Sequence, residues 1–452
     1  MKKYLALILG LCLTVGLGGC ANTPAEKTPE TQPESGNEQF DIVIVGAGGA
    51  GLAAAVEAHE QGADNILVLE KMSFAGGSTT MAFGGFNCTN SRFMDEQGKE
   101  ETPVMLVDKI IKNGAGFADV DMAGIIAMET PKVIEWLDGF GSEWGKIRYA
   151  DLHCPTDGTI PGVELVKVLK EQAEKNGIEI RYNSPAVDLI ADESGRVSGV
   201  QVKDANGEYT IDAQAVILAT GGFESNPEMI AKYDNPGLAH IHLAPSQGNM
   251  GDGIVMAEKL GAELRNMDLI QLSCAVAPFS IQMQLPIKNN GVVFINKEGK
   301  RFTNEYSEAS SDRRITEDIL KQTDAECFGV YNETIYQTFM AIEEKDFFDE
   351  YRMTGIDNSG TVIKADTLEE LAEKLGVDQE TFLATMNGLK TDNIGNEEVV
   401  KLADTYKSGP YYAVTLTPGV MDTLGGVLAD TTGRVINKEG KPIKGLYAAG
   451  EV

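Results

Sequence analysis

Three glycines and one acidic residue near the start of the chain have the spacing that holds a diphosphate and a sugar. Gly46, Gly48 and Gly51 form a G-x-G-x-x-G sequence, and Glu70 follows Gly51 by nineteen residues. Glycine lets the main chain approach a pyrophosphate closely, and the free N–H groups at the start of a helix favour its negative charge. A carboxylate about 20 residues further along can accept hydrogen bonds from ribose hydroxyls. The spacing therefore predicts a dinucleotide-binding site.

The elements around these residues have the order that such a site requires. A short apolar strand at residues 40–45 precedes the glycines, an alanine-rich helix extends to His59, and a second strand covers residues 65–70. A strand, glycine turn, helix and strand in this order are typical of a Rossmann-like unit with a parallel sheet. The sequence therefore predicts an α/β fold.

Two segments from distant parts of the chain are expected to complete this sheet. Residues 215–222 and 445–452 are each a short apolar strand that ends in small residues, where a cofactor can approach. The region between them contains a predicted strand at 291–296 and a predicted helix at 368–375, but no other dinucleotide motif. We therefore expect an inserted α+β capping domain at 268–422, within a nucleotide-binding domain formed by residues 40–267 and 423–452.

The first residues have the pattern of an export signal. Lys2 and Lys3 precede an apolar run that is too short to span a bilayer, and Leu17-Gly-Gly-Cys20 follows. This resembles a bacterial lipoprotein leader, in which cleavage before the cysteine frees its thiol for lipid. We expect a signal peptide at 1–19, lipidation at Cys20, a flexible polar tether at 20–39, and a place on the extracytoplasmic face of the cell membrane. The alternative is a secretory leader with an incidental cysteine.

Charge and cysteine usage exclude several classes of function. The formal net charge of −30 over 452 residues disfavours nucleic acid as a partner. No C-x-x-C pair occurs, so the sequence predicts neither a metal site nor a c-type haem attachment. We favour buried free thiols over a disulfide for the four cysteines outside the leader, which are Cys88, Cys154, Cys274 and Cys327.

A further set of motifs covers nearly all of the chain after the tether. They are EK at 70–71, GGSTTMAFGGFN at 76–87, HCPT at 153–156, ATGGF at 219–223, GDG at 251–253, GKRFTNE at 299–305, TPGV at 417–420 and LGG at 424–426. Together they resemble the FAD-dependent fumarate reductase and urocanate reductase family, the flavoprotein part of flavocytochrome c. The resemblance implies a Rossmann-like FAD-binding domain of the glutathione-reductase type. Relatives in membrane complexes bind FAD covalently through a histidine, and none lies between His59 and His153, so we expect non-covalent FAD.

The resemblance also implies which residues contact the cofactor. Those expected at the phosphates are Gly46, Gly48, Ala50 and Gly51. Those expected at the adenosine are Glu70, Lys71 and the backbone of Val187. Those expected at the ribityl chain and isoalloxazine are Ser78, Thr79, Gly84 and Gly85, with Thr220, Gly221, Asp252 and Glu451 completing the flavin site.

The resemblance implies that hydride passes from the flavin to an activated C=C bond while an arginine of the cap protonates the neighbouring carbon. Arg313 and Arg314 are the candidates, with Arg313 slightly favoured, because they follow Asn304-Glu305 after a short insertion. A guanidinium pKa above about 12 requires that the transfer be concerted and the proton be restored by a relay. The alternative is a solvated charge pair or a carboxylate-binding pair.

The substrate side departs from the family pattern. Ser273 and Asp422 replace two histidines that grip a dicarboxylate, Thr423 follows, and Gln284-Leu285 and Lys288 replace a Thr-Glu pair and a relay arginine. Asp422 would repel a second carboxylate, so fumarate itself is not expected. We predict an unsaturated monocarboxylate or a neutral enone, whose hydroxyl, amine or imidazole Asp422 could bind. Asp422 could instead only shape the turn before the LGG motif, and His240 and His242 are more simply explained by surface or packing roles.

Without a haem motif, we expect electrons from a separate membrane or surface carrier of anaerobic respiration. Relatives continue past the segment matching 445–452 into a substrate-binding arginine and a helix that faces the flavin, so we expect the sequence as written to be C-terminally truncated and to bind FAD weakly. Two alternatives stay open. One is a ketosteroid-type desaturase, for which Tyr306, Tyr411 and Tyr412 are candidates, and the other is a non-catalytic flavin electron carrier.

Overall fold

The computed structural model describes residues 38–147, 152–234, 246–277, 290–305, 312–341, 347–392, 394–395 and 397–452. Several residues singled out above lie outside these ranges. They are Cys20, His240, His242, Gln284, Leu285, Lys288 and Tyr306.

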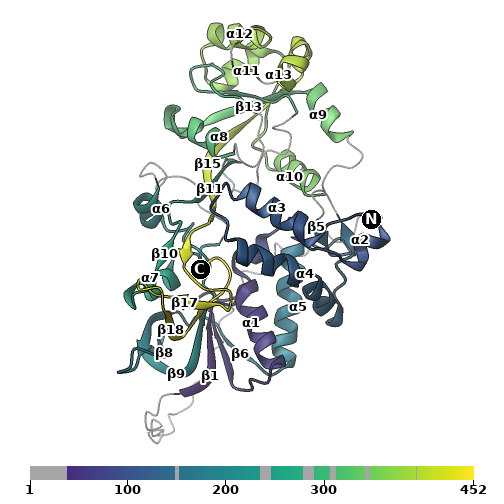
Figure 1. Ribbon diagram of the computed structural model, residues 1–452. Helices are drawn as coiled ribbons and strands as arrows, with labels where there is room; N and C mark the ends of the chain where they lie inside the picture. The colour runs from purple at the N-terminus through teal and green to yellow at the C-terminus, as the bar shows by residue number, and fades with distance from the viewer. Residues whose placement is uncertain are drawn as a thin grey trace, which may run out of the picture. The chain divides into compact units, whose positions relative to one another are not determined.

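An eight-stranded sheet forms the framework of the first domain (Figure 1). Its main strands have the order β17-β18-β9-β1-β2-β6, and β8 pairs antiparallel with β9 and with β7. Strands β18, β9, β1, β2 and β6 are parallel, so their carboxyl ends meet at one edge. The strands are β1 Glu38–Val45, β2 Ile66–Leu69, β6 Glu179–Arg181, β7 Ala186–Ala191, β8 Val197–Asp204, β9 Gly207–Leu218, β17 Arg434–Ile436 and β18 Pro442–Ala448.

Both faces of this sheet are covered, which explains why β2 and residues 42–45 of β1 are apolar without a break. Val43 and Val45 of β1 belong to one core and Ile44 belongs to the other, as the two-residue period of a strand requires. The core of Ile44 includes residues of α1, α4 and α5. The helices are α1 Gly49–Glu60, α4 Val120–Gly139 and α5 Pro161–Lys175, with α2 Arg92–Glu96, α3 Pro103–Asn113, α6 Pro227–Tyr233 and α7 Asp252–Lys259 elsewhere in this domain.

A small three-stranded sheet and one short strand pair complete the first domain. Strands β3, β5 and β4 form a three-stranded antiparallel sheet, and β10 pairs antiparallel with β16. Their bounds are β3 Phe86–Asn87, β4 Lys146–Ile147, β5 Leu152–Cys154, β10 Leu264–Arg265 and β16 Gly426–Val427.

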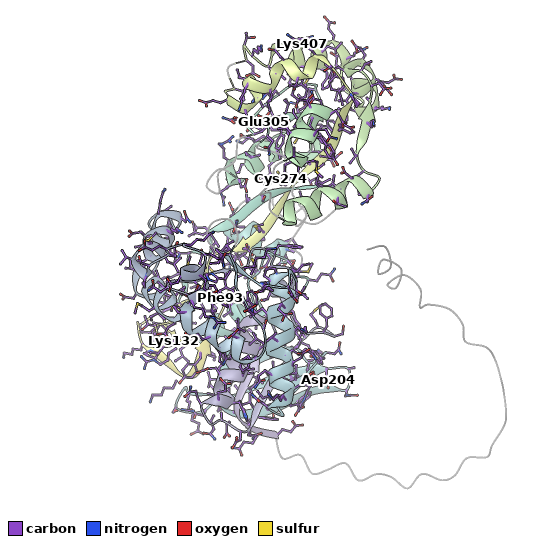
Figure 2. The ribbon with its side chains drawn as sticks, turned by 90° about the vertical axis from the view of Figure 1, so that its right-hand side faces the viewer. Phe93, Lys132, Asp204, Cys274, Glu305 and Lys407 are labelled. Atoms are coloured by element: carbon purple, nitrogen blue, oxygen red, sulfur yellow. The ribbon has the colours of Figure 1, made fainter. Side chains whose placement is uncertain are left out.

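A second sheet with its own core forms the cap. Its order is β11-β15-β13-β12, and β14 also pairs with β15. Helices α8, α11 and α12 contribute buried residues to a core around Phe294, Tyr331 and Phe382. Cys274 and Glu305 of the cap are labelled in Figure 2. The cap strands are β11 Ile270–Val276, β12 Val293–Ile295, β13 Cys327–Asn332, β14 Ile363–Ala365 and β15 Tyr411–Thr423. The cap helices are α8 Asp312–Leu320, α9 Glu333–Met340, α10 Phe347–Asn358, α11 Leu368–Leu375, α12 Gln379–Gly388 and α13 Glu397–Leu402.

One antiparallel strand pair links the cap to the first domain. Ile270 and Leu272 of β11 and Val420 of β15 belong to a core of the main sheet, whereas Cys274 and Leu416 belong to the core of the cap. The register shifts between Gln271 and Leu272, just before the pair leaves one core for the other between Leu272 and Cys274. These two strands therefore connect the two domains, and Ser273 and Asp422 lie on this strand pair.

The structure confirms the elements predicted around the glycine motif and in the cap. The strands predicted at 40–45, 65–70 and 291–296 correspond to β1, β2 and β12, and the helix predicted at 368–375 is α11. Cys88, Cys154, Cys274 and Cys327 are buried free thiols. Across the ranges that the structure describes, no helix is long and apolar enough to cross a membrane.

Candidate functional site

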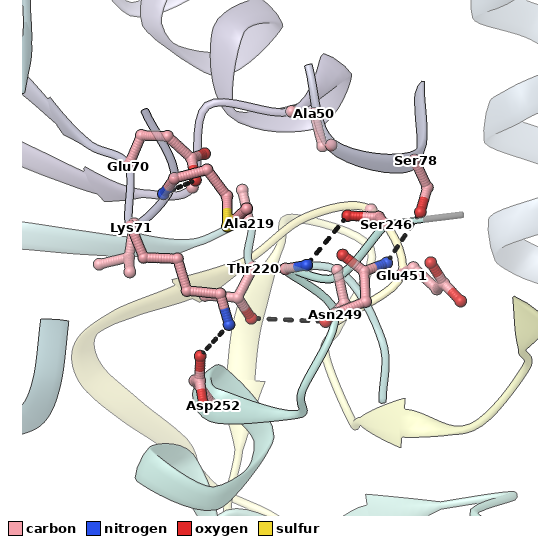
Figure 3. A pocket seen from close by; sticks show the side chains of 18 of the residues that line it. Ala50, Glu70, Lys71, Ser78, Ala219, Thr220, Ser246, Asn249, Asp252 and Glu451 are labelled. Atoms are coloured by element: carbon pink, nitrogen blue, oxygen red, sulfur yellow. Dashed lines mark hydrogen bonds and ion pairs between the residues drawn. The ribbon is translucent and has the colours of Figure 1, made fainter. Parts of the chain in front are cut away.

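A cavity of about 850 Å³ opens at the carboxyl ends of the parallel strands (Figure 3). Each of four strands contributes the residues that follow it, which is where open α/β sheets bind ligands. Residues after β1, β2, β9 and β18 line the cavity, together with the short η1 turn, Gly77–Met81. Predicted cofactor residues brought together in this lining are Gly46, Gly48, Ala50, Glu70, Lys71, Ser78, Thr79, Thr220, Gly221, Asp252 and Glu451.

The glycine turn leaves no room for side chains. Gly46 has a φ of 108°, and a Cβ atom there would lie 2.2 Å from the carbonyl oxygen of Ala219. A Cβ atom at Gly51 would lie 1.9 Å from the carbonyl oxygen of Gly46. Gly48, the N-cap of α1, supplies no side-chain cap, and the N–H of Gly49 donates to Thr79 Oγ1 over 3.1 Å. The positive end of the helix dipole at this start favours an anion. Gly51 itself packs under the turn and does not line the cavity.

Glu70 and Lys71 lie at the end of β2 and are held by contacts within the protein. The N–H groups of Ala47 and Met72 donate to the two carboxylate oxygens of Glu70, each over 2.8 Å. Lys71 Nζ forms an ion pair of 2.5 Å with Asp252 Oδ2, on the first turn of α7 (Figure 3). Glu70 thus joins the glycine turn to β2 while its side chain lines the cavity.

Polar side chains from three regions meet on another part of the lining. Asn249 Nδ2 donates to Ser78 Oγ over 3.1 Å and also to Glu224 Oε1. Ser78 Oγ lies 3.3 Å from the same oxygen of Glu224. The carboxylate of Glu224 is fully buried behind Ser78 and Asn249. The motifs did not indicate Glu224 or Asn249 as site residues, although Glu224 directly follows the ATGGF motif at 219–223.

Two further carboxylates lie near Glu224. Glu451 Oε1 accepts hydrogen bonds from the N–H and the hydroxyl of Thr423, over 2.9 and 3.2 Å. Burial, then the negative charges of Glu451 and Asp422, raise the pKa of Glu224 to about 8. Burial also raises the pKa of Glu451, against the lowering effect of the Thr423 N–H, and it raises the pKa of Asp422. This end of the cavity is therefore acidic but incompletely ionised.

Some residues predicted to contact the cofactor lie outside the cavity lining. The lining near the end of β2 contains Ser184, Pro185 and Ala186 rather than the neighbouring Val187, whose side chain is exposed. Gly84 and Gly85 pack toward β5, where a Cβ atom at Gly85 would lie 2.2 Å from the carbonyl oxygen of His153. Lining residues that the motifs did not indicate are Met72, Ser246, Gly248, Asn249, Ala449 and Gly450.

The predicted substrate residues on β11 and β15 differ in their surroundings. Ser273 is buried and pairs with Gly419 across the two strands, so it belongs to the connection between domains. Thr423 is also buried, and its hydrogen bonds position Glu451 rather than leaving it open to a substrate. Asp422 is partly buried and pairs with Gln271. None of the three is in the cavity lining, and Asp422 is the one whose side chain is not fully buried.

The two candidate arginines lie on α8, and ion pairs hold both of them. Arg313 donates to Asp234 through Nη2, to Glu317 through Nε, and to the carbonyl oxygen of Ile270 through Nη1. Arg314 donates to Thr303, Asp318 and the carbonyl oxygen of Asn304. Neither lines the cavity. In this conformation carboxylates bind both guanidinium groups, and the role of either arginine as proton donor stays a prediction.

Comparison with known proteins identifies the family. Residues 41–452 match the family described as the FAD binding domain. The chain belongs to this family. It is 30% identical over 428 residues to fumarate reductase (cytochrome) of Shewanella frigidimarina, covering 92% of this chain and 72% of that protein. It is 34% identical over 454 residues to urocanate reductase of Eggerthella lenta, covering 94% of this chain and 72% of that protein.

A solved structure has the same architecture. The open conformation of a flavocytochrome c3 fumarate reductase superposes with a TM-score of 0.81 and 28% sequence identity, covering 92% of this chain and 73% of that one. The mixed α/β fold and the resemblance to the fumarate and urocanate reductase family are thereby confirmed. The flavoprotein is an FAD-dependent oxidoreductase.

The residues of the cavity fit FAD. The side-chain-free turn at Gly46 and the start of α1 suit a diphosphate, and Glu70 stands beside them for the ribose. The cavity continues past Ser78 and Thr79 to Glu451, where the other end of a long dinucleotide would lie.

Proposed function

We propose that this flavoprotein reduces the C=C bond of a small unsaturated monocarboxylate or enone. The bound flavin would supply hydride to the β-carbon. The protein would hold the substrate's carboxylate or carbonyl, exclude water, and provide a proton to the α-carbon from a cap arginine. The reductase names of the relatives support the reaction class, and the charges of the site support the choice of substrate.

The acidity around Asp422 carries the choice of substrate. Asp422, Glu451 and Glu224 act on one another electrostatically at one end of the site. A dicarboxylate would bring a second negative charge to this end, whereas a hydrogen-bond donor such as an imidazole, amine or hydroxyl would be stabilised there. A neutral acceptor or a monocarboxylate with a donor group at its far end therefore suits the site better than fumarate.

Reoxidation of the reduced flavoprotein tests the substrate class. Viologen-reduced protein is mixed with urocanate, other enoates, enones or fumarate, and kcat/KM is compared. We expect the best enoate to exceed fumarate at least tenfold. Asp422→His should move this ratio toward fumarate, with Asp422→Asn as the control for loss of charge alone. Faster reduction of fumarate by the wild type would contradict the proposal.

The proton donor is tested at Arg313 and Arg314 separately. Replacement of the donor by glutamine should lower kcat by about 100-fold or more, and replacement of the other arginine much less. Asp234→Asn is the control for the ion pair of Arg313, because it removes the partner but keeps the guanidinium. Unchanged substrate-dependent reoxidation in both arginine variants would favour a pure electron carrier. Dye-linked oxidation of saturated ketones would favour a desaturase.

We further propose that the mature protein is anchored through lipid on Cys20, binds FAD non-covalently, and takes electrons from a separate surface carrier. The leader pattern and the acidic, haem-motif-free sequence support this. Cys20→Ala should move the protein from the membrane fraction to the soluble fraction without changing viologen-linked kcat. Acid precipitation should release the flavin, and efficient reduction by NADH alone would contradict the need for a carrier.

A further inference from the structure

A buried glutamate lies directly behind the lining of the flavin cavity. Glu224 follows β9 and has no exposed surface. Its Oε1 accepts hydrogen bonds from Ser78 and Asn249, two neutral side chains that line the cavity. Its Oε2 is buried and has no hydrogen-bond partner among the residues that the structure describes. An ionised carboxylate in such a place would be poorly compensated.

Glu224 also faces a second carboxylate across a glycine. A Cβ atom at Gly222 would lie 2.9 Å from Glu224 Oε2 and 2.7 Å from Glu451 Oε1, so the missing side chain leaves both oxygens beside the same space. Glu451 Oε1 receives two hydrogen bonds from Thr423, which favour its ionised form. Two carboxylates that share a site do not both ionise readily, and the more deeply buried one, Glu224, keeps the proton.

We propose that Glu224 is a positioning residue that stays a neutral carboxylic acid at pH 7, and that its proton adjusts the reduction potential of the flavin above neutral pH. The proposal requires bound FAD but not the C=C chemistry of the previous section. Its geometric basis is the unpartnered oxygen, the facing carboxylate of Glu451 and the contacts to Ser78 and Asn249.

The charges around Glu224 agree with this assignment. The titratable groups that face it are Glu451, after β18, and Asp422, on β15, and both are acidic. Ser78 and Asn249, on the cavity side, are neutral. Burial and these charges raise its pKa to about 8. Glu224 is therefore protonated in neutral solution and ionises at moderately alkaline pH.

Reduction of the flavin should tighten the hold of Glu224 on its proton. Two electrons from dithionite or an electrode, with one proton, leave the flavin one unit more negative than before. This negative charge, in the cavity that Ser78 and Asn249 separate from Glu224, would raise the pKa of Glu224 further, by about one pH unit or more. Between the pKa values for the oxidised and reduced forms, reduction takes up a second proton from solvent, which binds to Glu224. The potential then falls with pH up to twice as steeply.

The pH dependence of the midpoint potential tests the proposal. The FAD-loaded protein is titrated spectroscopically with redox mediators from pH 6 to pH 10. In the wild type, the slope should steepen above about pH 8, where Glu224 begins to ionise in the oxidised protein. In Glu224→Gln, the potential should match the wild type at pH 7, because both side chains are neutral, and the steepening should be lost.

Glu101→Gln is the matched control. Glu101 is also a buried glutamate with an oxygen that has no hydrogen-bond partner among the described residues, but it pairs with Lys109 and does not line the cavity. The midpoint potential of the flavin in Glu101→Gln should equal that in the wild type at every pH. Parallel lines for the wild type and Glu224→Gln would overturn the proposal.

A measurement on the wild type alone covers the case in which Glu224→Gln does not fold. The infrared difference spectrum between reduced and oxidised protein at pH 8.5 should contain the C=O stretching band of a newly protonated carboxylic acid, shifted in D₂O. Absence of this band would also overturn the proposal. If the protein takes up no FAD, the family assignment fails instead, so the two failures are distinguishable.

Discussion

Gly46, Gly51 and Glu70 show that local spacing determines the phosphate end of the site. The contacts of Gly51 with Gly46 and of Glu70 with Ala47 lie within one strand, turn, helix and strand unit, so the sequence alone could predict them. The opposite end could not be predicted in the same way. Glu224 acquires its chemistry from Ser78 and Glu451, which are 146 and 227 residues away, and no local pattern records such a meeting.

Gly51→Ala should abolish FAD binding. The added methyl group would overlap the carbonyl oxygen of Gly46 and displace the turn that faces the diphosphate. Titration of the variant and the wild type with added FAD measures the effect. Gly124→Ala is the control, because Gly124 lies within α4 with no atom within 4 Å of an added Cβ. It should bind FAD normally and be slightly more stable, by about 0.5–1 kcal/mol.

At the scale of elements, the cap depends on a buried ion-pair network. Arg301 forms a bidentate ion pair with Glu305 and a second ion pair with Asp392. Glu305, labelled in Figure 2, has no exposed surface and also accepts a hydrogen bond from the N–H of Phe294. This network fixes the segment from which Thr303 and Asn304 contact Arg314. The GKRFTNE motif indicated the family but not this role, because Asp392 joins from a distant helix end.

Arg301→Met should destabilise the protein by about 3–5 kcal/mol, since it leaves the buried Glu305 without its partner. Denaturant unfolding followed by fluorescence measures the free energy of unfolding. Lys390→Met breaks an exposed pair with Asp404 and should change that free energy little. Equal effects of the two substitutions would show that the network contributes no more than a surface ion pair.

The connection between the domains was also beyond prediction. Strands β11 and β15 lie at the two borders of the inserted domain predicted at 268–422, and each contributes side chains to two cores. Apolar alternation alone does not show which core a residue joins. Ser273 was accordingly interpreted as a substrate contact although it is buried between paired strands.

At the scale of the whole molecule, buried carboxylates make stability depend on pH. The folded-state pKa of Glu224 is about 8, above its ordinary value of 4.5. The folded protein therefore keeps a proton that the unfolded chain releases between these values. This contribution to stability is complete below about pH 4.5 and is lost as pH rises through about 8.

As pH rises from 6 to 9, the free energy of unfolding should therefore fall less in Glu224→Gln than in the wild type. At saturating FAD, the fall in Tm over this interval should be smaller in the variant by about 2 °C or more. Differential scanning calorimetry at several pH values measures the difference. An identical fall in both proteins would mean that Glu224 is already ionised at pH 6.

The cavity draws its lining from residues as far apart as Val45 and Glu451. Synthesis proceeds from the N-terminus, so a growing polypeptide presents the phosphate turn long before the segment that carries Glu451 has left the ribosome. Complete capture of the cofactor must then wait until that segment has been made. A cell short of riboflavin would accumulate molecules in which both parts of the lining have been synthesised but no cofactor lies between them.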